Sequence, residues 1–102
     1  SYSESQYGAM ANSLFEAMNG RGSSDDFDVM EGFYYWIKTD DDLKKVYSAF
    51  GVRYISSFLQ FGFSFGGKRH NLKTGLYAEL DDTKRERDLR DKFKTKFISA
   101  GL

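Results

Sequence analysis

The sequence lacks cysteine and proline and contains a single histidine, His70. Without cysteine the chain forms no disulfide, no thiolate metal site and no cysteine nucleophile. One histidine excludes metal sites built from several histidines, and a Ser-His-Asp triad is possible only through His70. The absence of proline removes the strongest helix breaker and permits helices throughout the chain.

The chain also lacks a long apolar run and an excess of charge of either sign. No apolar run approaches the roughly 18 residues of a membrane span. The polar start, SYSESQYG, does not have the layout of a signal peptide. Lys and Arg together number 15, as do Asp and Glu, so the net charge is zero. This balance argues against a generally basic nucleic-acid binder. The 102 residues suffice for one domain.

Apolar residues recur at helical spacing through most of the chain, which predicts an all-α fold, a compact bundle of about five to six short helices. Residues 1–8 are predicted to be a flexible N-terminal tail, and residues 9–102 the single helical domain. Asn19-Gly20 is expected to end the first helix and Gly51 the third, because glycine commonly ends helices. The expected N-caps of the later helices are Ser23 or Ser24, Thr39 or Asp40, and Asp81 or Asp82 before a last helix at residues 83–99.

Two adjoining segments in the middle of the chain are harder to assign. Residues 52–61, VRYISSFLQF, fit a helix by spacing but contain residues that also favour strands. We expect a short helix there, because the segments around it read as helical. Residues 61–71, FGFSFGGKRHN, are rich in glycine and have no helical period, so we expect a loop with aromatic anchors. Leucines at spacing four predict a further short helix over residues 72–80, which Gly75 weakens.

Acidic residues gather before and within the first turns of the second and third expected helices. Brought together, such carboxylates could bind calcium, which takes about six to eight oxygen ligands, but their spacing does not match an EF-hand loop. Favourable interaction with the helix dipole is the simpler interpretation. The glycines of the loop at residues 20–24 could likewise aim backbone groups at an ion, although an ordinary interhelical turn also explains them. The acidic residues are Asp25, Asp26, Asp28, Asp40, Asp41 and Asp42.

Basic residues concentrate in the second half of the chain. Residues 1–51 carry 4 basic and 9 acidic side chains, whereas residues 52–102 carry 11 basic and 6 acidic ones. Basic residues interleaved with aromatics could bind nucleic acid. The pairs Glu86/Arg90 and Asp88/Lys92 have the spacing of a salt-bridged, solvated helix face instead, which we favour. The basic run comprises Lys84, Arg85, Arg87, Arg90, Lys92, Lys94 and Lys96, with Lys68 and Arg69 upstream.

Aromatic residues are abundant, with ten Phe, seven Tyr and one Trp. Phe61, Phe63 and Phe65 alternate within the glycine-rich segment. An exposed aromatic loop would form a docking surface for another protein. The alternative is that the three rings pack beneath the loop and complete the core. His70 has no acidic neighbour in the sequence to orient it, so we interpret it as a surface histidine.

The stretch from Ala11 to Arg53 resembles an annexin repeat. The matching segments are LFEAMNGRGSSDD at residues 14–26 and DLKKVYSAFG at residues 42–51. The annexin pattern has an AMxGxGTDE turn between two helices, followed by a helix that ends in AF or AY. LYAEL at residues 76–80 is similar to the LxxEL segment of the same repeat.

This resemblance implies a right-handed bundle of short helices and a calcium site. The site would use the carbonyl groups of Gly20, Arg21 and Gly22 and would be completed by Glu79. Annexins carry several such repeats, whereas this chain has at most one, and a glycine- and phenylalanine-rich segment interrupts it. In this respect the chain is similar to small annexin-like proteins of Bacteroidetes-type bacteria and their phages.

We therefore expect a non-enzymatic structural or adaptor domain that makes protein–protein contacts in a larger assembly such as a phage virion, with other proteins or with copies of itself. One alternative is a calcium-dependent binder of membranes or acidic surfaces through the annexin-like loop. Another is a small nucleic-acid-binding module that uses residues 84–96. No cofactor other than calcium is expected. The residues expected to contact a partner are Phe61, Phe63, Phe65, Lys68, Arg69, Arg85 and Arg90.

Overall fold

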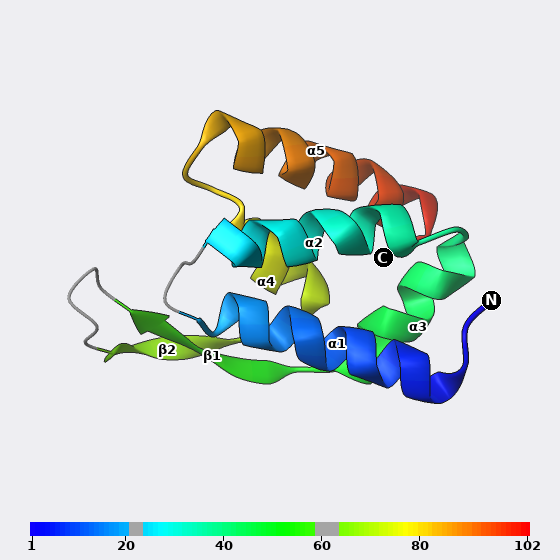
Figure 1. Cartoon of the computed structure of the whole chain (residues 1–102), viewed down its shortest axis with the longest axis horizontal. Coiled ribbons are helices and arrows are strands. Elements are labelled where there is room, and N and C mark those ends of the chain that lie inside the picture. Colours follow the sequence, from blue (N-terminus) through cyan, green and yellow to red (C-terminus); the bar gives the residue numbers. More distant parts are fainter. Residues whose placement is uncertain (21–23, 59–63) are drawn as a thin grey trace.

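The computed structural model describes residues 1–20, 24–58 and 64–102. Within these ranges the chain forms five helices and one two-stranded antiparallel hairpin (Figure 1). None of these helices is both long and apolar enough to cross a membrane. The elements are α1 (Glu4–Met18), α2 (Ser24–Trp36), α3 (Asp40–Phe50), β1 (Arg53–Phe58), β2 (Ser64–His70), α4 (Leu72–Glu79) and α5 (Lys84–Ser99).

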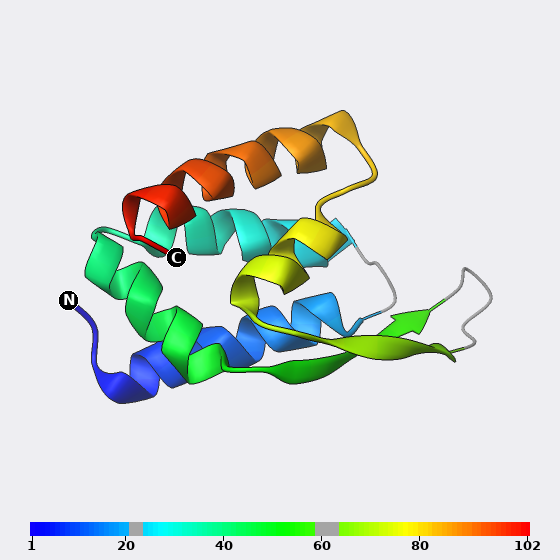
Figure 2. The same cartoon turned by 180° about the vertical axis from the view of Figure 1, so that it is seen from behind.

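The helices are stacked, and the hairpin closes one side of the stack. α5 packs on α2, α2 packs on α1, and the hairpin runs along the side of α1 that faces away from α2 (Figures 1 and 2). α3 crosses the stack at the end where α1 begins. The hairpin extends past the helices at the opposite end, where α1 ends and α2 begins (Figure 1).

The expectation of an all-α fold is right for most of the chain and wrong for its middle. The helix expected at residues 52–61 is replaced by β1, and the loop expected at residues 61–71 contains β2. The residues of β1 satisfy a strand pattern because Ile55 is buried while its neighbour Tyr54 is exposed. Pairing with a strand that lies later in the chain fixes this choice, and local spacing does not reveal such pairing.

The two strands approach closely at Gly67. The register pairs Tyr54 with Arg69, Ile55 with Lys68 and Ser56 with Gly67. A Cβ atom on Gly67 would lie 2.2 Å from the carbonyl oxygen of Ile55, so this position requires glycine. The glycines that suggested a loop therefore include one that allows the strands to pair.

Four of the five helices begin with a capping box, in which the N-cap side chain and the N3 side chain each accept a backbone N–H. Thr39 caps α3 as expected, and Gly51, with φ of 60°, ends it. The cap of α5 is Thr83 rather than either preceding aspartate. The other two capping boxes start at Ser3 and Asn71.

The N-terminal residues are not the expected tail. The capping box at Ser3 starts α1 at Glu4, so residues 4–8 are helical. Before the helix, the Tyr2 ring stacks on Trp36 with 3.7 Å between ring centroids. The Tyr2 hydroxyl also donates a hydrogen bond to the Trp36 carbonyl at 2.8 Å. Aromatic packing against the end of α2 thus holds this segment in place, which helical periodicity from Ala9 onward did not indicate.

The apolar stripes predicted for the helices meet in one core. Phe33 from α2 and Phe93 from α5 are fully buried, and their rings stack with centroids 5.7 Å apart. Leu14 of α1, Val46 of α3 and Leu76 of α4 are also fully buried. Each of the five helices therefore buries apolar residues at the predicted spacing, whereas Ile98, predicted as part of the stripe of α5, is 77% exposed.

A glycine on an outer helix face offers a simple stability test. Gly32 lies within α2, is exposed, and would have no atom within 4 Å of an added Cβ. Gly32→Ala is expected to raise the free energy of unfolding by about 0.5–1 kcal/mol, because alanine loses less backbone entropy in a helix. Urea unfolding followed by circular dichroism measures the change. A decrease in stability would show that this glycine is required for the fold.

Candidate functional site

The hairpin carries exposed apolar and basic side chains side by side. Val52 and Tyr54 are 64% and 52% exposed. They lie two residues apart on the face opposite to the buried Ile55, and Arg69 pairs directly with Tyr54. Lys68 and Arg69 are also exposed; Arg69 lies on the face of Tyr54, whereas Lys68 pairs with Ile55 and lies on the opposite face of the sheet. We call Val52, Tyr54, Lys68 and Arg69 the hairpin surface.

The residues expected to contact a partner do not form one surface. Phe61 and Phe63 lie outside the described residues, and Phe65 falls within β2. Arg85 and Arg90 are on α5, which lies on the opposite side of the helix stack from the hairpin (Figure 1). Phe65, Lys68 and Arg69 therefore belong to the hairpin, which also exposes Val52 and Tyr54. Sequence reasoning missed these two because it assigned their segment to a helix.

Most of the cationic side chains on α5 lie over aromatic rings. The Arg85 guanidinium lies 3.9 Å from the centroid of the Phe27 ring. Lys92 and Lys96 lie over Tyr34, at 5.8 and 4.7 Å from its centroid. Lys94 lies 5.5 Å from the centroid of Tyr77. These cation–π contacts attach α5 to α2 and α4, so much of the basic run has a structural role.

The ion pairs of α5 differ from those predicted. In the described ranges Arg90 pairs with Asp81, and Lys84 pairs with Asp88 at 2.9 Å. Glu86 does not pair with Arg90, because its carboxylate accepts the backbone N–H groups of Asp82 and Thr83 at 3.0 Å each. Glu86, which the helical spacing assigned to a salt bridge, is therefore part of the capping box instead.

Residues of the calcium site implied by the annexin resemblance lie at one end of the molecule. Arg21 and Gly22 are outside the described residues, whereas Gly20 follows α1 and Glu79 ends α4. An Asp26 carboxylate oxygen lies 3.2 Å from the position of a Cβ on Gly20, and the charge of Asp26 also acts on Glu79. Two carboxylates and the Gly20 backbone are thus gathered from three parts of the chain. The described ranges contain no group of three or more His, Cys, Asp or Glu side chains placed to hold a metal ion.

The environment of Glu79 raises its affinity for a proton. Partial burial, followed by the negative charges of Asp26 and Glu86, raises the pKa of Glu79 from 4.5 to about 7. A carboxyl whose folded pKa lies above its unfolded value stabilises the fold below the unfolded pKa, and this contribution is lost as the pH rises through the folded pKa.

Glu79→Gln should therefore change how stability depends on pH. We expect the wild-type melting temperature to fall, relative to that of Glu79→Gln, as the pH rises from 4.5 to about 7. Thermal unfolding across this pH range, with chelator present, measures the difference. Glu16→Gln, at an exposed position of α1, is the control and should follow the wild type. Parallel curves for wild type and Glu79→Gln would contradict the expectation.

The predicted acidic cluster is divided between the two ends of the molecule. Asp26 lies near Gly20, while Asp40 accepts a hydrogen bond from Ser99 at the far end. Asp42 is only 1% exposed and accepts a hydrogen bond of 2.7 Å from the Tyr7 hydroxyl. It also accepts the backbone N–H of Lys38 at 3.0 Å. Calcium binding by the whole cluster is therefore excluded by its geometry, and helix capping accounts for Asp42 only in part.

Hydrogen bonds keep the buried Asp42 ionised. Burial by itself would raise the pKa of Asp42, but hydrogen bonds from the Tyr7 hydroxyl and the Lys38 and Thr39 backbone amides outweigh it. The pKa of Asp42 therefore lies below its ordinary value of 3.8. The same contact raises the pKa of Tyr7, chiefly through its hydrogen bond to Asp42. These residues join α1 to α3 and are 35 positions apart in the sequence.

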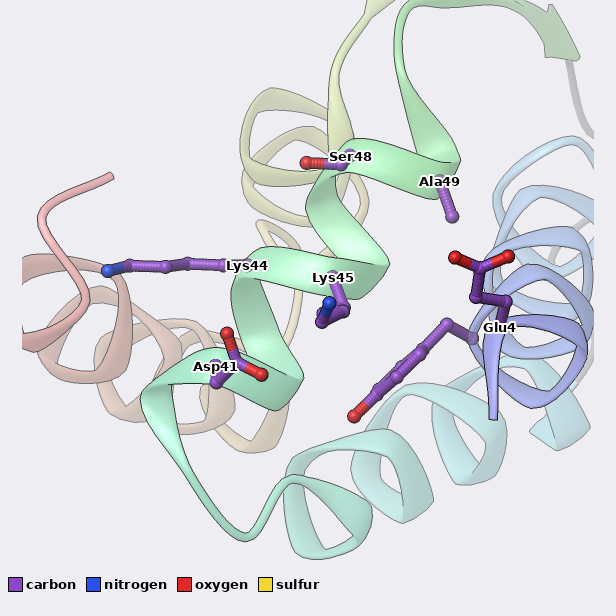
Figure 3. A pocket seen from close by; sticks show the side chains of 7 residues that line it. Glu4, Asp41, Lys44, Lys45, Ser48 and Ala49 are labelled. Carbon is purple, nitrogen blue, oxygen red and sulfur yellow. The ribbon is translucent and has the colours of Figure 1, made fainter. Parts of the chain in front are cut away.

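A shallow groove of about 480 Å³ runs between α1 and α3 (Figure 3). In Figure 3 the carboxylate of Glu4 points toward Ala49, whereas Lys44 extends away from α1. The groove combines acidic and basic side chains and contains no histidine. Its lining residues are Glu4, Tyr7, Asp41, Lys44, Lys45, Ser48 and Ala49.

His70 lies at the end of β2 and contacts a hydroxyl group. Its Nδ1 atom is 3.1 Å from the Thr74 hydroxyl oxygen, which also accepts the Asn71 backbone N–H. This places the ring beside the capping box of α4. Comparison of the chain with models of protein families, with curated proteins and with solved structures finds no match.

Proposed function

We propose that the chain is a non-enzymatic structural or adaptor domain that contacts other proteins in a larger assembly. The hairpin surface is the observation that carries this proposal. Val52 and Tyr54 expose apolar area beside the cation of Arg69, and Lys68 is exposed on the other face of the same strand. Tyrosine and arginine are the residues that most often dominate protein interfaces, especially when apolar contacts surround them.

The position of the hairpin supports the same function. The hairpin forms one outer side of the molecule, so a partner can reach it without displacing a helix (Figure 1). The helices beside the hairpin have a buried apolar core and capped ends. A virion or a similar particle is the assembly we favour, since the five helices in their order are compatible with one annexin-like repeat that carries a hairpin between its third and fourth helices.

The test compares two exposed tyrosine positions in cells that make the protein from its own gene. The wild-type chain is expected to sediment with a large assembly rather than as an 11.7-kDa monomer. Val52→Ser/Tyr54→Ser should sediment as a monomer while keeping the wild-type circular dichroism. Tyr35→Ser, which removes a tyrosine that is 60% exposed on α2, is the matched control and should sediment like the wild type. Assembly of the hairpin variant, or a wild-type chain that is always monomeric, would overturn the proposal.

A second candidate function is calcium-dependent binding to membranes or acidic surfaces. It is favoured by the approach of an Asp26 carboxylate oxygen to Gly20 and by the effect of the Asp26 charge on Glu79. Carboxylate and carbonyl oxygens are the ligands that calcium prefers, and neighbouring carboxylates that repel each other gain from a shared cation.

Calorimetry with millimolar calcium tests this candidate. Binding should release or absorb heat and raise the melting temperature of the wild type but not of Glu79→Gln, because a ligand that binds only the folded state stabilises it. Magnesium is the control ion, since its strict octahedral geometry suits such a site poorly. No heat and no change in melting temperature with calcium would eliminate the candidate.

A further inference from the structure

A two-stranded sheet has two outer edges. In the described residues, only the edge formed by β1 has a backbone group that is hydrogen-bonded to a helix end. At the edge of β1, the backbone N–H of Ser56 donates a hydrogen bond of 2.8 Å to the Asn19 side chain at the end of α1. Apart from the ladder with β1, no backbone hydrogen bond involves Gly67 or Arg69 of β2 in the described ranges. The edge of β2 is therefore open.

The bond to Asn19 also shows which groups of β2 point outward. In an antiparallel pair, residues alternate between those that direct their N–H and C=O groups at the partner strand and those that direct them away. Since the Ser56 N–H points to Asn19, Ser56 and its partner Gly67 belong to the second kind. By alternation, so do Tyr54 and its partner Arg69. Within the part of the chain that the structure describes, Gly67 and Arg69 thus direct backbone groups without a hydrogen-bond partner along the open edge.

The charge of the hairpin indicates what would pair with this edge. Its described residues include Arg53, Lys68 and Arg69 and no acidic residue. Arg53 is already held, because its guanidinium donates to the Phe50 carbonyl and the Asn12 side chain, each at 2.9 Å. Lys68 and Arg69 are exposed on opposite faces of β2, and no ion pair within the described ranges involves either of them. A second copy of β2 would bring like charges together, which protects edges from self-pairing.

We propose that the open edge of β2 accepts an extended acidic segment of a partner protein as a third strand. The backbone of the segment pairs with Gly67 and Arg69, and its carboxylates lie on the face of the sheet that carries Tyr54 and Arg69, where they meet the Arg69 guanidinium. This mode of recognition draws affinity from main-chain hydrogen bonds and specificity from side chains. The inference rests on the proposed adaptor function and names the class of its partner. A nucleic acid would use the cations but has no alternating amide groups to match the edge.

A synthetic peptide provides the probe. It alternates glutamate and valine and is about eight residues long, within the common range of strand lengths. At roughly ten times its Kd, amide hydrogen exchange at Gly67 and Arg69 of the full chain should slow by about tenfold relative to the free chain. The measurement is made by nuclear magnetic resonance, which reports each amide separately.

Two control peptides and two variants separate strand pairing from simple charge attraction. A peptide with lysine in place of glutamate should not bind, nor should a glutamate peptide that is N-methylated at alternate amides. Lys68→Glu/Arg69→Glu should reverse the preference toward the lysine peptide. Lys44→Glu/Lys45→Glu, which changes the same amount of charge on α3, should bind the glutamate peptide as the wild type does.

Each unfavourable outcome has a distinct meaning. Equal binding of the methylated and unmethylated peptides would overturn strand pairing, and so would binding of single-stranded DNA without any exchange protection at the edge. Dimerisation of the chain at high concentration through β2 would identify a second copy as the occupant and overturn the acidic partner. If no peptide binds while the Val52→Ser/Tyr54→Ser variant still leaves the assembly, the inference fails and the adaptor function stands. If that variant also assembles normally, both fail.

Discussion

Asp42→Ala is expected to lower the free energy of unfolding by about 3 kcal/mol. Asp42 is 1% exposed, and its carboxylate accepts hydrogen bonds from the Tyr7 hydroxyl at 2.7 Å and from the Lys38 backbone at 3.0 Å. Alanine removes the acceptor of these donors, and the loss of a buried, hydrogen-bonded carboxylate is costly. The substitution also removes one half of the capping box that starts α3 at Thr39.

Urea unfolding at neutral pH measures this loss. The control is Asp41→Ala, one residue earlier in α3, where the side chain is exposed; its effect should stay within about 0.5 kcal/mol. The difference in the free energy of unfolding between the wild type and Asp42→Asn should narrow as the pH falls below 3.8. The pKa of Asp42 is depressed in the folded protein, so its carboxylate stabilises the wild type above the unfolded pKa, and this contribution is lost on protonation. Equal effects of the two alanine substitutions would show that the Tyr7–Asp42 contact does not support the fold.

The second large effect is expected at Gly67. In Gly67→Ala the new Cβ would lie 2.2 Å from the Ile55 carbonyl oxygen and 2.9 Å from the Ser56 Cα. Both are backbone atoms, so no side chain can rotate away and the strands must separate. We expect a loss of about 2–3 kcal/mol, comparable to the overpacking of a core.

Urea unfolding gives the size of this effect, and amide hydrogen exchange shows where it acts. Exchange should quicken in β1 and β2 before it changes in α5. Gly32→Ala is the matched control, because the same substitution on an open helix face is expected to stabilise the protein. A Gly67→Ala variant as stable as the wild type would mean that the strands can shift their register at this point.

The helices could be predicted because their signals are local. Thr39 begins α3, Gly51 ends it, and the stripe between them faces the core. The hairpin could not be predicted in this way, since the residues of β1 satisfy helical and strand patterns alike. What decides between them is the pairing of Ser56 with Gly67, eleven positions later, and the absence of a side chain at that glycine.

The candidate sites show the same limit. The annexin resemblance named Gly20 and Glu79, but only the folded chain shows that Asp26 joins them. The contact between Tyr7 and Asp42 links residues 35 positions apart, and neither residue lies in a recognisable motif. Arg85 looked like a free cation in the sequence, because nothing in its neighbourhood reveals that Phe27 lies beneath it.

The way in which the hairpin joins the helices makes it an exchangeable unit. α3 stops at Gly51, where the Arg53 guanidinium also donates to the last carbonyls of the helix, and α4 starts through the capping box of Asn71, so both boundaries are set at the base of the hairpin. Arg53 and His70 pair at the base of the hairpin and bring the two points of attachment together. A lineage could therefore lengthen, shorten or replace this arm, and so acquire a new partner, while the helical body kept its sequence.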